Sequence, residues 1–409
     1  MKNMKLFFFI TIAGAAILMV SCTQKSQDWP GWRGENRDAK VVGFQLPDEW
    51  TARLDKIWQA SVGLGDAPPS YVDGKLFLHV QQDTSEIALC VDAVTGDEVW
   101  RVVLHPAIKM KGGGASHPGP RSTPQVADGR IFLLGAGGIF TCVDVSSGEI
   151  IWQNTDYPEF PVFYTSASPL VKGNMCVIHL GGHDNGVIVA FDVENGEKIW
   201  TIEGEPSTYS SPVFMKVGRD EIIVLQSETD LLGISTEGDV LFKIPTPGER
   251  RFYNSSTPVI VGQSVIVAGQ GIGTKSYKIE KSGDKYSFSE SWFNPDLGVS
   301  FNTPVFKDGY LYAHESRMGM LFCLNASTGE TCWADTVKHD RFALALDLGK
   351  VLLSLPATGE LLFYEPDPGA YIELAKYKVA ETPVYAHPVV VGNKIFVKDK
   401  EMLACWAIE

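Results

Sequence analysis

Side chains that could bind a ligand occur at one recurring place in the sequence, in the segments that lead into short Ser/Thr-Pro motifs or their counterparts. Arginine and histidine pair with anionic groups, and tyrosine combines a flat ring with a hydroxyl that hydrogen-bonds. If the fold brings these segments together, they predict a concave binding site for a partner or small molecule. The candidate residues are His117, Arg121, Tyr164, Tyr209, Arg251, Tyr253, Asn302, Arg341 and His387.

A second set of polar residues lies in the predicted turns that follow the second strand of a repeat. We expect these turns to reach the same site, where they would add histidines and amides to it. The alternative is a polar rim that only satisfies backbone groups. The second set comprises His79, His179, His183, Gln226, Gln270, His314 and Glu315.

Motifs for catalysis and metal binding are weak. The glycine run Gly112–Gly114 lies in a long loop rather than between a strand and a helix, so it does not match a nucleotide-binding fingerprint. His179 and His183 are four residues apart, but two glycines separate them and the sequence fixes no third ligand. No nucleophile motif or pair of catalytic carboxylates stands out. We therefore expect no catalytic residue and no metal site.

The elements that must position these residues follow from a repeated phrase, a glycine turn that ends in an aromatic residue. Examples are VDAVTGDEVW, VDVSSGEIIW, AFDVENGEKIW and LNASTGETCW. The seven intervals between residues 58 and 377 average about 46 residues, which is the length of one four-stranded propeller blade. The closing aromatic residues are Trp58, Trp100, Trp152, Trp200, Phe242, Trp292, Trp333 and Tyr377.

The two ends of the repeat array complement each other. The last repeat stops at EMLACWAIE after three strands, whereas residues 54–62 form a closing strand with no strands before it. Pairing the two completes the last blade and removes the open sheet edges. The sequence therefore predicts an all-β, eight-bladed β-propeller over residues 54–409, closed by its N-terminal strand. In each repeat we expect the glycine to supply a positive φ and the tryptophan to bury its ring between neighbouring blades.

The glycine turn with its tryptophan resembles the tryptophan-docking motif of the pyrroloquinoline quinone (PQQ)-like propeller family, over residues 54–409. The segment DWPGWRGENRDA, with Trp29, Trp32 and Arg33, is similar to a segment that opens many secreted members of this family. That resemblance implies a tryptophan-rich clamp against the propeller rather than a ligand site. We expect residues 22–53 to hold the lipidated N-terminus, a tether and this clamp.

The N-terminus has the plan of a bacterial export signal. Lys2 and Lys5 precede an apolar run over residues 6–20 that is too short to span a bilayer comfortably. Cys22 follows the small Ser21, as in a lipobox, so we expect residues 1–21 to be removed and Cys22 to carry lipid. An ordinary signal or an uncleaved anchor is the alternative. A lipid anchor alone would hold the protein to a membrane, and we expect the outer membrane, facing the periplasm.

Net charge limits the possible partners, and the positions of the cysteines indicate whether they form disulfides. The formal net charge is −14, and loss of two lysines with residues 1–21 makes it −16, so we exclude nucleic acid as a partner. Four cysteines occupy equivalent places in four repeats, a blade apart, so we expect small buried residues rather than a disulfide framework. These cysteines are Cys90, Cys142, Cys323 and Cys405.

Three functions are compatible with these features. The lipobox, eight blades and acidic surface resemble BamB-type outer-membrane lipoproteins, which implies a non-catalytic scaffold that engages a protein partner, small ligand or glycan without a cofactor. The alternative is a quinoprotein dehydrogenase that oxidises alcohols or sugars with PQQ and Ca²⁺. Such enzymes usually carry an adjacent cysteine pair, and no two cysteines are neighbours here. A carbohydrate-binding or carbohydrate-cleaving propeller is the third hypothesis, so the sequence favours a non-enzyme but leaves catalysis open.

Overall fold

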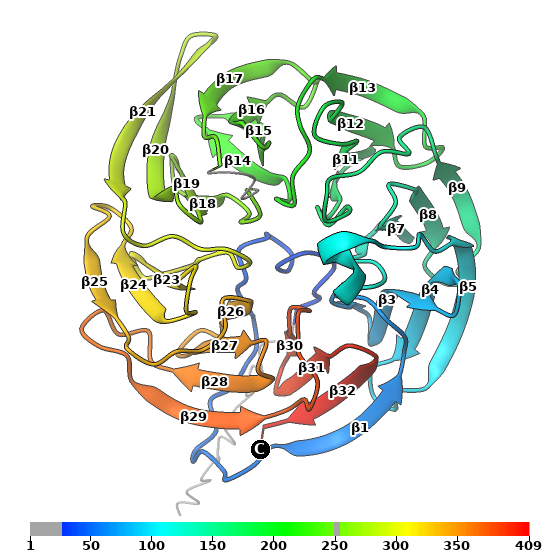
Figure 1. Ribbon diagram of the computed structural model, residues 1–409, viewed down its shortest axis with the longest axis vertical. Helices are drawn as coiled ribbons and strands as arrows, with labels where there is room; N and C mark the ends of the chain where they lie inside the picture. Colours follow the sequence, from blue (N-terminus) through cyan, green and yellow to red (C-terminus); the bar gives the residue numbers. More distant parts are fainter. Residues whose placement is uncertain (1–26, 249–253, 409) are drawn as a thin grey trace, which may run out of the picture.

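Eight antiparallel sheets form a ring, as expected (Figure 1). The structure is a computed structural model, and it describes residues 27–248 and 254–408. Each sheet has four strands, and the shortest strands lie nearest the axis. The predicted all-β, eight-bladed propeller is confirmed. The helical content of the described residues is one 3₁₀ turn, η1 (Gly112–Ser116).

The strands of each blade follow one another outward from the axis. Blade 1 contains β2 (Ser70–Val72), β3 (Lys75–Gln82), β4 (Ser85–Asp92) and β5 (Glu98–Pro106). Blade 2 contains β6 (Gln125–Ala127), β7 (Arg130–Leu134), β8 (Phe140–Asp144) and β9 (Ile150–Asn154). Blade 3 contains β10 (Leu170–Lys172), β11 (Met175–Leu180), β12 (Val187–Asp192) and β13 (Lys198–Glu203). Blade 4 contains β14 (Val213–Val217), β15 (Asp220–Gln226), β16 (Asp230–Ile234) and β17 (Val240–Pro245).

The second half of the ring repeats this plan. Blade 5 contains β18 (Val259–Val261), β19 (Ser264–Gly269), β20 (Gly273–Ser282) and β21 (Lys285–Asn294). Blade 6 contains β22 (Val305–Lys307), β23 (Tyr310–His314), β24 (Leu321–Asn325) and β25 (Thr331–Ala334). Blade 7 contains β26 (Ala343–Asp347), β27 (Leu352–Pro356), β28 (Glu360–Tyr364) and β29 (Glu373–Lys378). Blade 8 contains β30 (Val389–Val391), β31 (Lys394–Lys398) and β32 (Met402–Ala407), with β1 (Asp55–Ser61) as its outer strand.

The ring closes where the two ends of the propeller meet. β1 pairs antiparallel with β32, from Asp55 opposite Ala407 to Ser61 opposite Met402. The first strand of the propeller therefore completes the last blade, as the incomplete last repeat predicted.

Burial explains the sequence pattern of each blade. The second and third strands lie between neighbouring blades, so both of their faces are covered and they read as continuous apolar runs, such as MCVIHL in β11. The outer strands have one covered face and alternate, as in KIWTIE of β13. The ring thus has its core between the blades rather than at its axis.

The closing tryptophans join each blade to the next. The indole of Trp152 in blade 2 lies on Gly196 in blade 3, where a Cβ would stand 2.6 Å from the ring. The φ of Gly196 is +73°, which a side-chain-bearing residue rarely adopts. Equivalent hydrogen bonds from the indole Nε1 to a carbonyl oxygen of the following blade's turn are made by Trp58, Trp100, Trp152, Trp200, Trp292 and Trp333. The predicted docking role is confirmed.

Residues 27–45, here called the axial segment, lie in the centre of the ring, where Figure 1 shows them in blue. Trp29 exchanges two backbone hydrogen bonds of 2.8 Å with Tyr71 of blade 1. Pro30 accepts a hydrogen bond from the backbone N–H of Val126 in blade 2. The indole of Trp32 donates to Thr257 in blade 5 at 2.9 Å. One short stretch of chain therefore bonds to blades on several sides of the axis.

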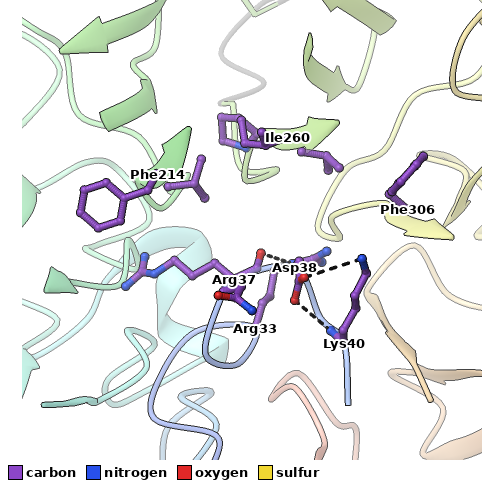
Figure 2. Close-up of a pocket in the computed structure, with 11 residues that line it drawn as sticks. Arg33, Arg37, Asp38, Lys40, Phe214, Ile260 and Phe306 are labelled. Atoms are coloured by element: carbon purple, nitrogen blue, oxygen red, sulfur yellow. Dashed lines mark hydrogen bonds and ion pairs between the residues drawn. The ribbon is translucent and has the colours of Figure 1, made fainter. Parts of the chain in front are cut away.

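Two buried arginines extend these bonds (Figure 2). Arg33 donates to the carbonyl oxygens of Thr303 and Pro304 in blade 6 at 3.0 and 2.9 Å. Arg37 donates to backbone carbonyls that lead into blades 3 and 4, including that of Pro212 at 2.9 Å. Burial lowers the pKa of Arg37 to about 9, which still leaves its guanidinium charged at neutral pH. The clamp role of the whole segment 22–53 remains a prediction.

The predicted signal peptide and Cys22 lie outside the described residues. Within the described part of the chain, no helix has the length and apolar character needed to cross a membrane.

Candidate functional site

A cavity of about 650 Å³ opens at one end of the axis, and we call it the mouth. Its walls come from all eight blades, chiefly from the loops that lead into the innermost strands, and Trp32 of the axial segment also lines it. The aromatic lining residues are Trp32, Phe163, Tyr209, Phe301, Phe342 and Tyr385. The lining residues with ionisable or amide side chains are Asp66, His117, Arg121, Gln270 and Arg341.

An aromatic pair with a cation forms one wall of the mouth. The rings of Phe301 and Phe342 stack with centroids 4.0 Å apart and planes 2° from parallel. The guanidinium of Arg341 lies over both rings, 5.4 and 5.7 Å from their centroids. Tyr385 meets Phe342 edge to face at 5.1 Å. Stacked rings offer apolar area, and the cation beside them can attract a carboxylate.

A histidine and an aspartate face each other across the mouth wall. Nδ1 of His117 lies 2.8 Å from Oδ2 of Asp66, and the imidazole also meets Tyr385 edge to face at 4.5 Å. Donation from Nδ1 to the carboxylate orients the ring and directs Nε2 away from Asp66. Asp66 therefore fixes the orientation in which the imidazole of His117 faces the mouth.

Arg121 lines the mouth but is committed to the loops around it. Its guanidinium donates to the carbonyl oxygens of His117, at 2.7 Å, and Phe163. It also lies over the ring of Tyr164 at 5.7 Å. Burial lowers the pKa of Arg121. Because both terminal nitrogens of its guanidinium already have acceptors, Arg121 shapes the loops, and Arg341 is the better placed cation for a ligand.

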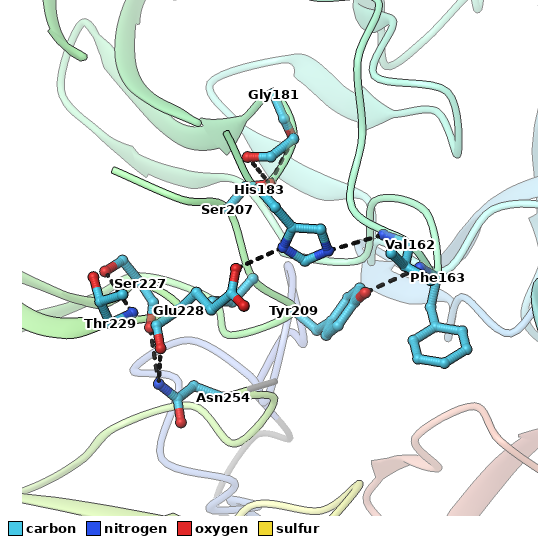
Figure 3. Close-up of polar contacts among 12 residues, drawn as sticks. Val162, Phe163, Gly181, His183, Ser207, Tyr209, Ser227, Glu228, Thr229 and Asn254 are labelled. Carbon is cyan, nitrogen blue, oxygen red and sulfur yellow. Dashed lines mark hydrogen bonds and ion pairs between the residues drawn. The ribbon is translucent and has the colours of Figure 1, made fainter. Parts of the chain in front are cut away.

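A second set of polar contacts holds the loop that presents Phe163 (Figure 3). The backbone N–H of Phe163 donates to the hydroxyl of Tyr209 at 3.0 Å. The N–H of Val162 donates to Nε2 of His183 at 3.2 Å, and Nδ1 of His183 donates to Glu228 at 2.6 Å. This chain of bonds runs from blade 4 to the loop before blade 3. Tyr209 and His183 therefore hold the loop in position through its backbone N–H groups.

The structure brings some of the predicted residues together in the mouth. Those that line it are His117, Arg121, Tyr209, Gln270 and Arg341. Arg251 and Tyr253 lie outside the described residues. Whether any of these side chains binds a ligand remains a prediction.

Three residues of the first predicted set lie beneath the mouth rather than in its lining. Tyr164 is buried, with φ at +68°, and its hydroxyl accepts the N–H of Lys111 at 2.6 Å. Asn302 donates to the carbonyl oxygen of His314 at 3.0 Å. His387 lies under the edge of Trp32, with ring centroids 5.7 Å apart. All three support the loops or the axial segment from below.

Most of the second predicted set lies outside the mouth lining. Nε2 of His179 donates to the carbonyl oxygen of Glu205 at 2.9 Å, and burial lowers the pKa of His179 to about 4. Burial likewise lowers the pKa of His314 to about 3, and its Nδ1 lies 2.9 Å from the carbonyl oxygen of Gly319. The carboxylate of Glu315 accepts backbone N–H groups of its own turn. Three further members, His79, His183 and Gln226, are also absent from the mouth lining.

Sequence reasoning missed most of the aromatic lining. The missed residues include Phe163, Phe301, Phe342 and Tyr385, each within two residues of a predicted one. Their aromatic character was the available signal, since a concave site is commonly lined by aromatic rings.

The residues that line the mouth do not fit PQQ with Ca²⁺. Among the described lining residues, Asp66 is the one carboxylate, and it already faces His117. Calcium takes six to eight oxygen ligands, usually with several carboxylates. The described cysteines also lie elsewhere: five are buried, and Cys332 is on the outer strand β25. A stacked ring system with a carboxylate could rest on the aromatic wall, but the calcium set is not provided there.

The known proteins that are similar to this chain include assembly factors and alcohol dehydrogenases. The sequence profile of the family described as outer membrane protein assembly factor BamB matches residues 55–183 and 85–335. Outer membrane protein assembly factor BamB of Burkholderia pseudomallei is 22% identical over 402 residues, which cover 95% of this chain and 94% of that protein.

Subunit 1 of methanol dehydrogenase [cytochrome c] from Methylorubrum extorquens is 24% identical over 201 residues, which cover 44% of this chain and 31% of the enzyme. This chain thus aligns with less than a third of that relative. Among solved structures, a europium-containing methanol dehydrogenase superposes with a TM-score of 0.70 at 10% identity, covering 93% of this chain and 98% of that chain. Quinohemoprotein alcohol dehydrogenase ADHIIG from Pseudomonas putida HK5 gives a TM-score of 0.67 at 12% identity, covering 93% and 80%. At such identities the superpositions show a shared fold alone.

Proposed function

This chain belongs to the family described as outer membrane protein assembly factor BamB, and from that premise we propose that it is a non-catalytic binding propeller of a bacterial envelope. In this proposal, a lipid at Cys22 tethers it to the outer membrane facing the periplasm. Its mouth holds a segment of a protein partner.

The aromatic wall of the mouth is the observation that supports this proposal most. A cavity of about 650 Å³ is large enough for a few side chains of an inserted segment. Phe301 and Phe342 offer flat apolar area, and Arg341 places a cation beside them. Aromatic and arginine side chains contribute most of the energy at protein interfaces. An extended segment with an apolar side chain next to an acidic one suits this wall.

The oriented polar groups add selectivity to such a wall. His117, held by Asp66, presents an imidazole on the same side as Tyr385. Oriented hydrogen-bonding groups of this kind can recognise the backbone amides of an inserted segment.

A quinoprotein dehydrogenase is the second candidate, because solved structures of such enzymes share the fold across most of this chain. The lining residues described above argue against it, since one carboxylate does not make a calcium site. We therefore rank the binding propeller first.

A site-specific photocrosslink tests the binding role. A photoreactive phenylalanine analogue replaces Phe301 in the mouth, or Phe288 on the exposed part of β21 as the matched control. We expect a crosslink to an outer-membrane protein from position 301 and none from position 288. The crosslink from position 301 should be lost when Arg341 is also changed to alanine. Equal products at both positions, or none at 301, would contradict the proposal.

Two further measurements test the remaining parts. Titration of the full-length protein with PQQ and Ca²⁺, followed by absorbance and by dye reduction with alcohols and sugars, should show neither tight binding nor turnover. Calcium-dependent binding with turnover would instead establish the enzyme. For the anchor, Cys22→Ser should abolish lipid labelling and release the protein from the membrane fraction.

A further inference from the structure

Blade 1 contains a buried cluster of two histidines and one glutamate, away from the residues that line the mouth. His79 lies on β3, Glu86 on β4 and His105 on β5, so three adjacent strands contribute one side chain each. All three side chains are buried, with His79 0% and Glu86 1% exposed. Their candidate ligand atoms all lie within 4.8 Å of one another.

Strand register explains why these side chains meet. Glu86 is the direct cross-strand partner of His105, and His79 pairs with Ala88, two residues beyond Glu86. A β-bulge between Glu86 and Ile87 inserts an extra residue in β5. The bulge turns His105, rather than Leu104, toward Glu86. Bulges are known to re-aim side chains in this way beside functional sites.

The atoms converge without satisfying one another. Nε2 of His79 lies 3.1 Å from Oε2 of Glu86, and Nε2 of His105 lies 3.7 Å from the same oxygen. Within the described part of the chain, these three atoms have no hydrogen-bond partner. Ligands around a tetrahedral zinc ion stand about 3.4 Å apart, given metal–ligand bonds of about 2.1 Å. The two separations from Oε2 of Glu86, 3.1 and 3.7 Å, are close to this spacing.

Outer contacts orient two of the three groups for metal binding. Nδ1 of His105 donates to the carbonyl oxygen of Pro106 at 3.1 Å, which leaves the lone pair on Nε2. Oε1 of Glu86 accepts the N–H of Ala136 in blade 2 at 3.2 Å, which leaves Oε2 for the cluster. Such outer hydrogen bonds typically fix the tautomer and direction of metal ligands.

A glycine of blade 2 leaves space beside the ligand atoms. A Cβ on Gly135 would stand 2.8 Å from both Oε2 of Glu86 and Nε2 of His105. Gly135 has no positive φ, so its backbone does not require glycine. The lack of a side chain therefore matters for the space next to the cluster.

We propose that His79, Glu86 and His105 bind a divalent transition-metal ion, for which Zn²⁺ is the best match. Two imidazole nitrogens and one carboxylate oxygen make a three-ligand set, with a fourth position for water. The ion would pin three strands of blade 1 to the turn of blade 2 that carries Ala136. The proposal is independent of the partner held at the mouth.

The competing explanation is a proton shared between Glu86 and His79. A shared proton accounts for their 3.1 Å approach, but it does not need His105 or the space at Gly135. The two explanations therefore differ in how the protein responds to zinc and to substitution of Gly135.

The test uses detergent-solubilised full-length protein without a polyhistidine tag, stripped of metal with a chelator. Zinc content is measured by elemental mass spectrometry. The Tm is measured by thermal unfolding with and without Zn²⁺, and the coordination number is read from the visible spectrum of the Co²⁺ form. We expect one zinc ion per chain, a higher Tm with zinc, and the intense bands of four-coordinate cobalt.

Matched variants separate the site from other histidines. Glu86→Gln removes the charged ligand, and Gly135→Ala keeps all three ligands but fills the space; each should weaken zinc binding at least tenfold. Gly137→Ala, on the same turn with 3.5 Å of clearance, and His179→Gln, a buried histidine of blade 3, should retain one zinc. No zinc uptake by the wild type, or equal uptake by Glu86→Gln, would overturn the proposal and favour the shared proton.

Discussion

The indole Nε1 of Trp152, on the outer strand of blade 2, donates a 3.1 Å hydrogen bond to the carbonyl oxygen of Val193 in blade 3. The same ring covers Gly196 in the following turn. Because six closing tryptophans make this contact, six of the eight blades are joined in this way to the blade that follows.

Gly196→Ala should destabilise the propeller more than Gly173→Ala. Both glycines have positive φ, +73° and +56°, so both substitutions strain the backbone. A Cβ on Gly196 also meets Trp152 at 2.6 Å, whereas one on Gly173 meets nothing within 4 Å. We expect Gly196→Ala to lower the free energy of unfolding by about 1–3 kcal/mol beyond the control. Urea unfolding followed by tryptophan fluorescence measures both, and equal losses would count against blade docking.

Arg37→Lys should weaken the attachment of the axial segment. The guanidinium of Arg37 reaches carbonyl oxygens ahead of two different blades, and a single ammonium cannot reproduce that fork. We expect the free energy of unfolding to fall by at least about 2 kcal/mol, because hydrogen bonds from a buried charged group are lost. Arg219→Lys, on the exposed turn between β14 and β15, is the control and should change it little. A similar small effect for both variants would refute the predicted clamp.

Acid should destabilise the protein partly through His387. Burial and the nearby charge of Arg33 lower the pKa of His387 to about 3, whereas an unfolded histidine titrates near its ordinary value of 6.5. Between these values the unfolded state binds more protons, so stability falls as the pH falls below about 6.5. One such group contributes up to about 1.4 kcal/mol per pH unit. Urea midpoints from pH 7 to pH 5 should decline less steeply in His387→Gln, and an unchanged slope would rule this contribution out.

Cys332 should be the first described cysteine to react with an alkylating reagent. The other five described cysteines are buried, and burial raises the pKa of Cys90 and Cys405 to about 11. Reaction needs an accessible thiolate, so these thiols should stay unmodified in the native protein. Peptide mass spectrometry after brief iodoacetamide treatment gives the order, and the urea-unfolded protein shows that all six can react. Early labelling of Cys90 would mean that blade 1 opens.

The fold could be predicted from the sequence because every blade must meet the same packing requirements, and these requirements recur along the chain as a repeat. A positive φ at Gly196 and a flat ring at Trp152 follow from how adjacent blades pack, so they recur with the blade length. Ring closure was equally readable, since β1 has a docking tryptophan but no blade of its own.

The mouth was harder to predict, because a difference of one or two residues along the chain decides whether a side chain enters the cavity or goes beneath it. Phe301 lines the mouth while its neighbour Asn302 binds a backbone carbonyl, and Tyr385 lines it while His387 packs under Trp32. In each pair the polar residue lies beneath the mouth and the aromatic residue lines it. Loop conformation decides which side chain enters the cavity, and loops lack the two-residue periodicity by which a strand can be read from a sequence.

The pairing of β1 with β32 sets an order of events during biosynthesis. β1 is synthesised before the other strands of the propeller and must wait, with its edge unpaired, until the last blade has been made. Contacts between the two ends of a chain form slowly, because a long loop must close before they stabilise anything. We expect the nascent protein to depend on chaperones until its final residues have been made. A chain truncated within blade 8 would then remain an open arc, whose free edges invite pairing with other chains.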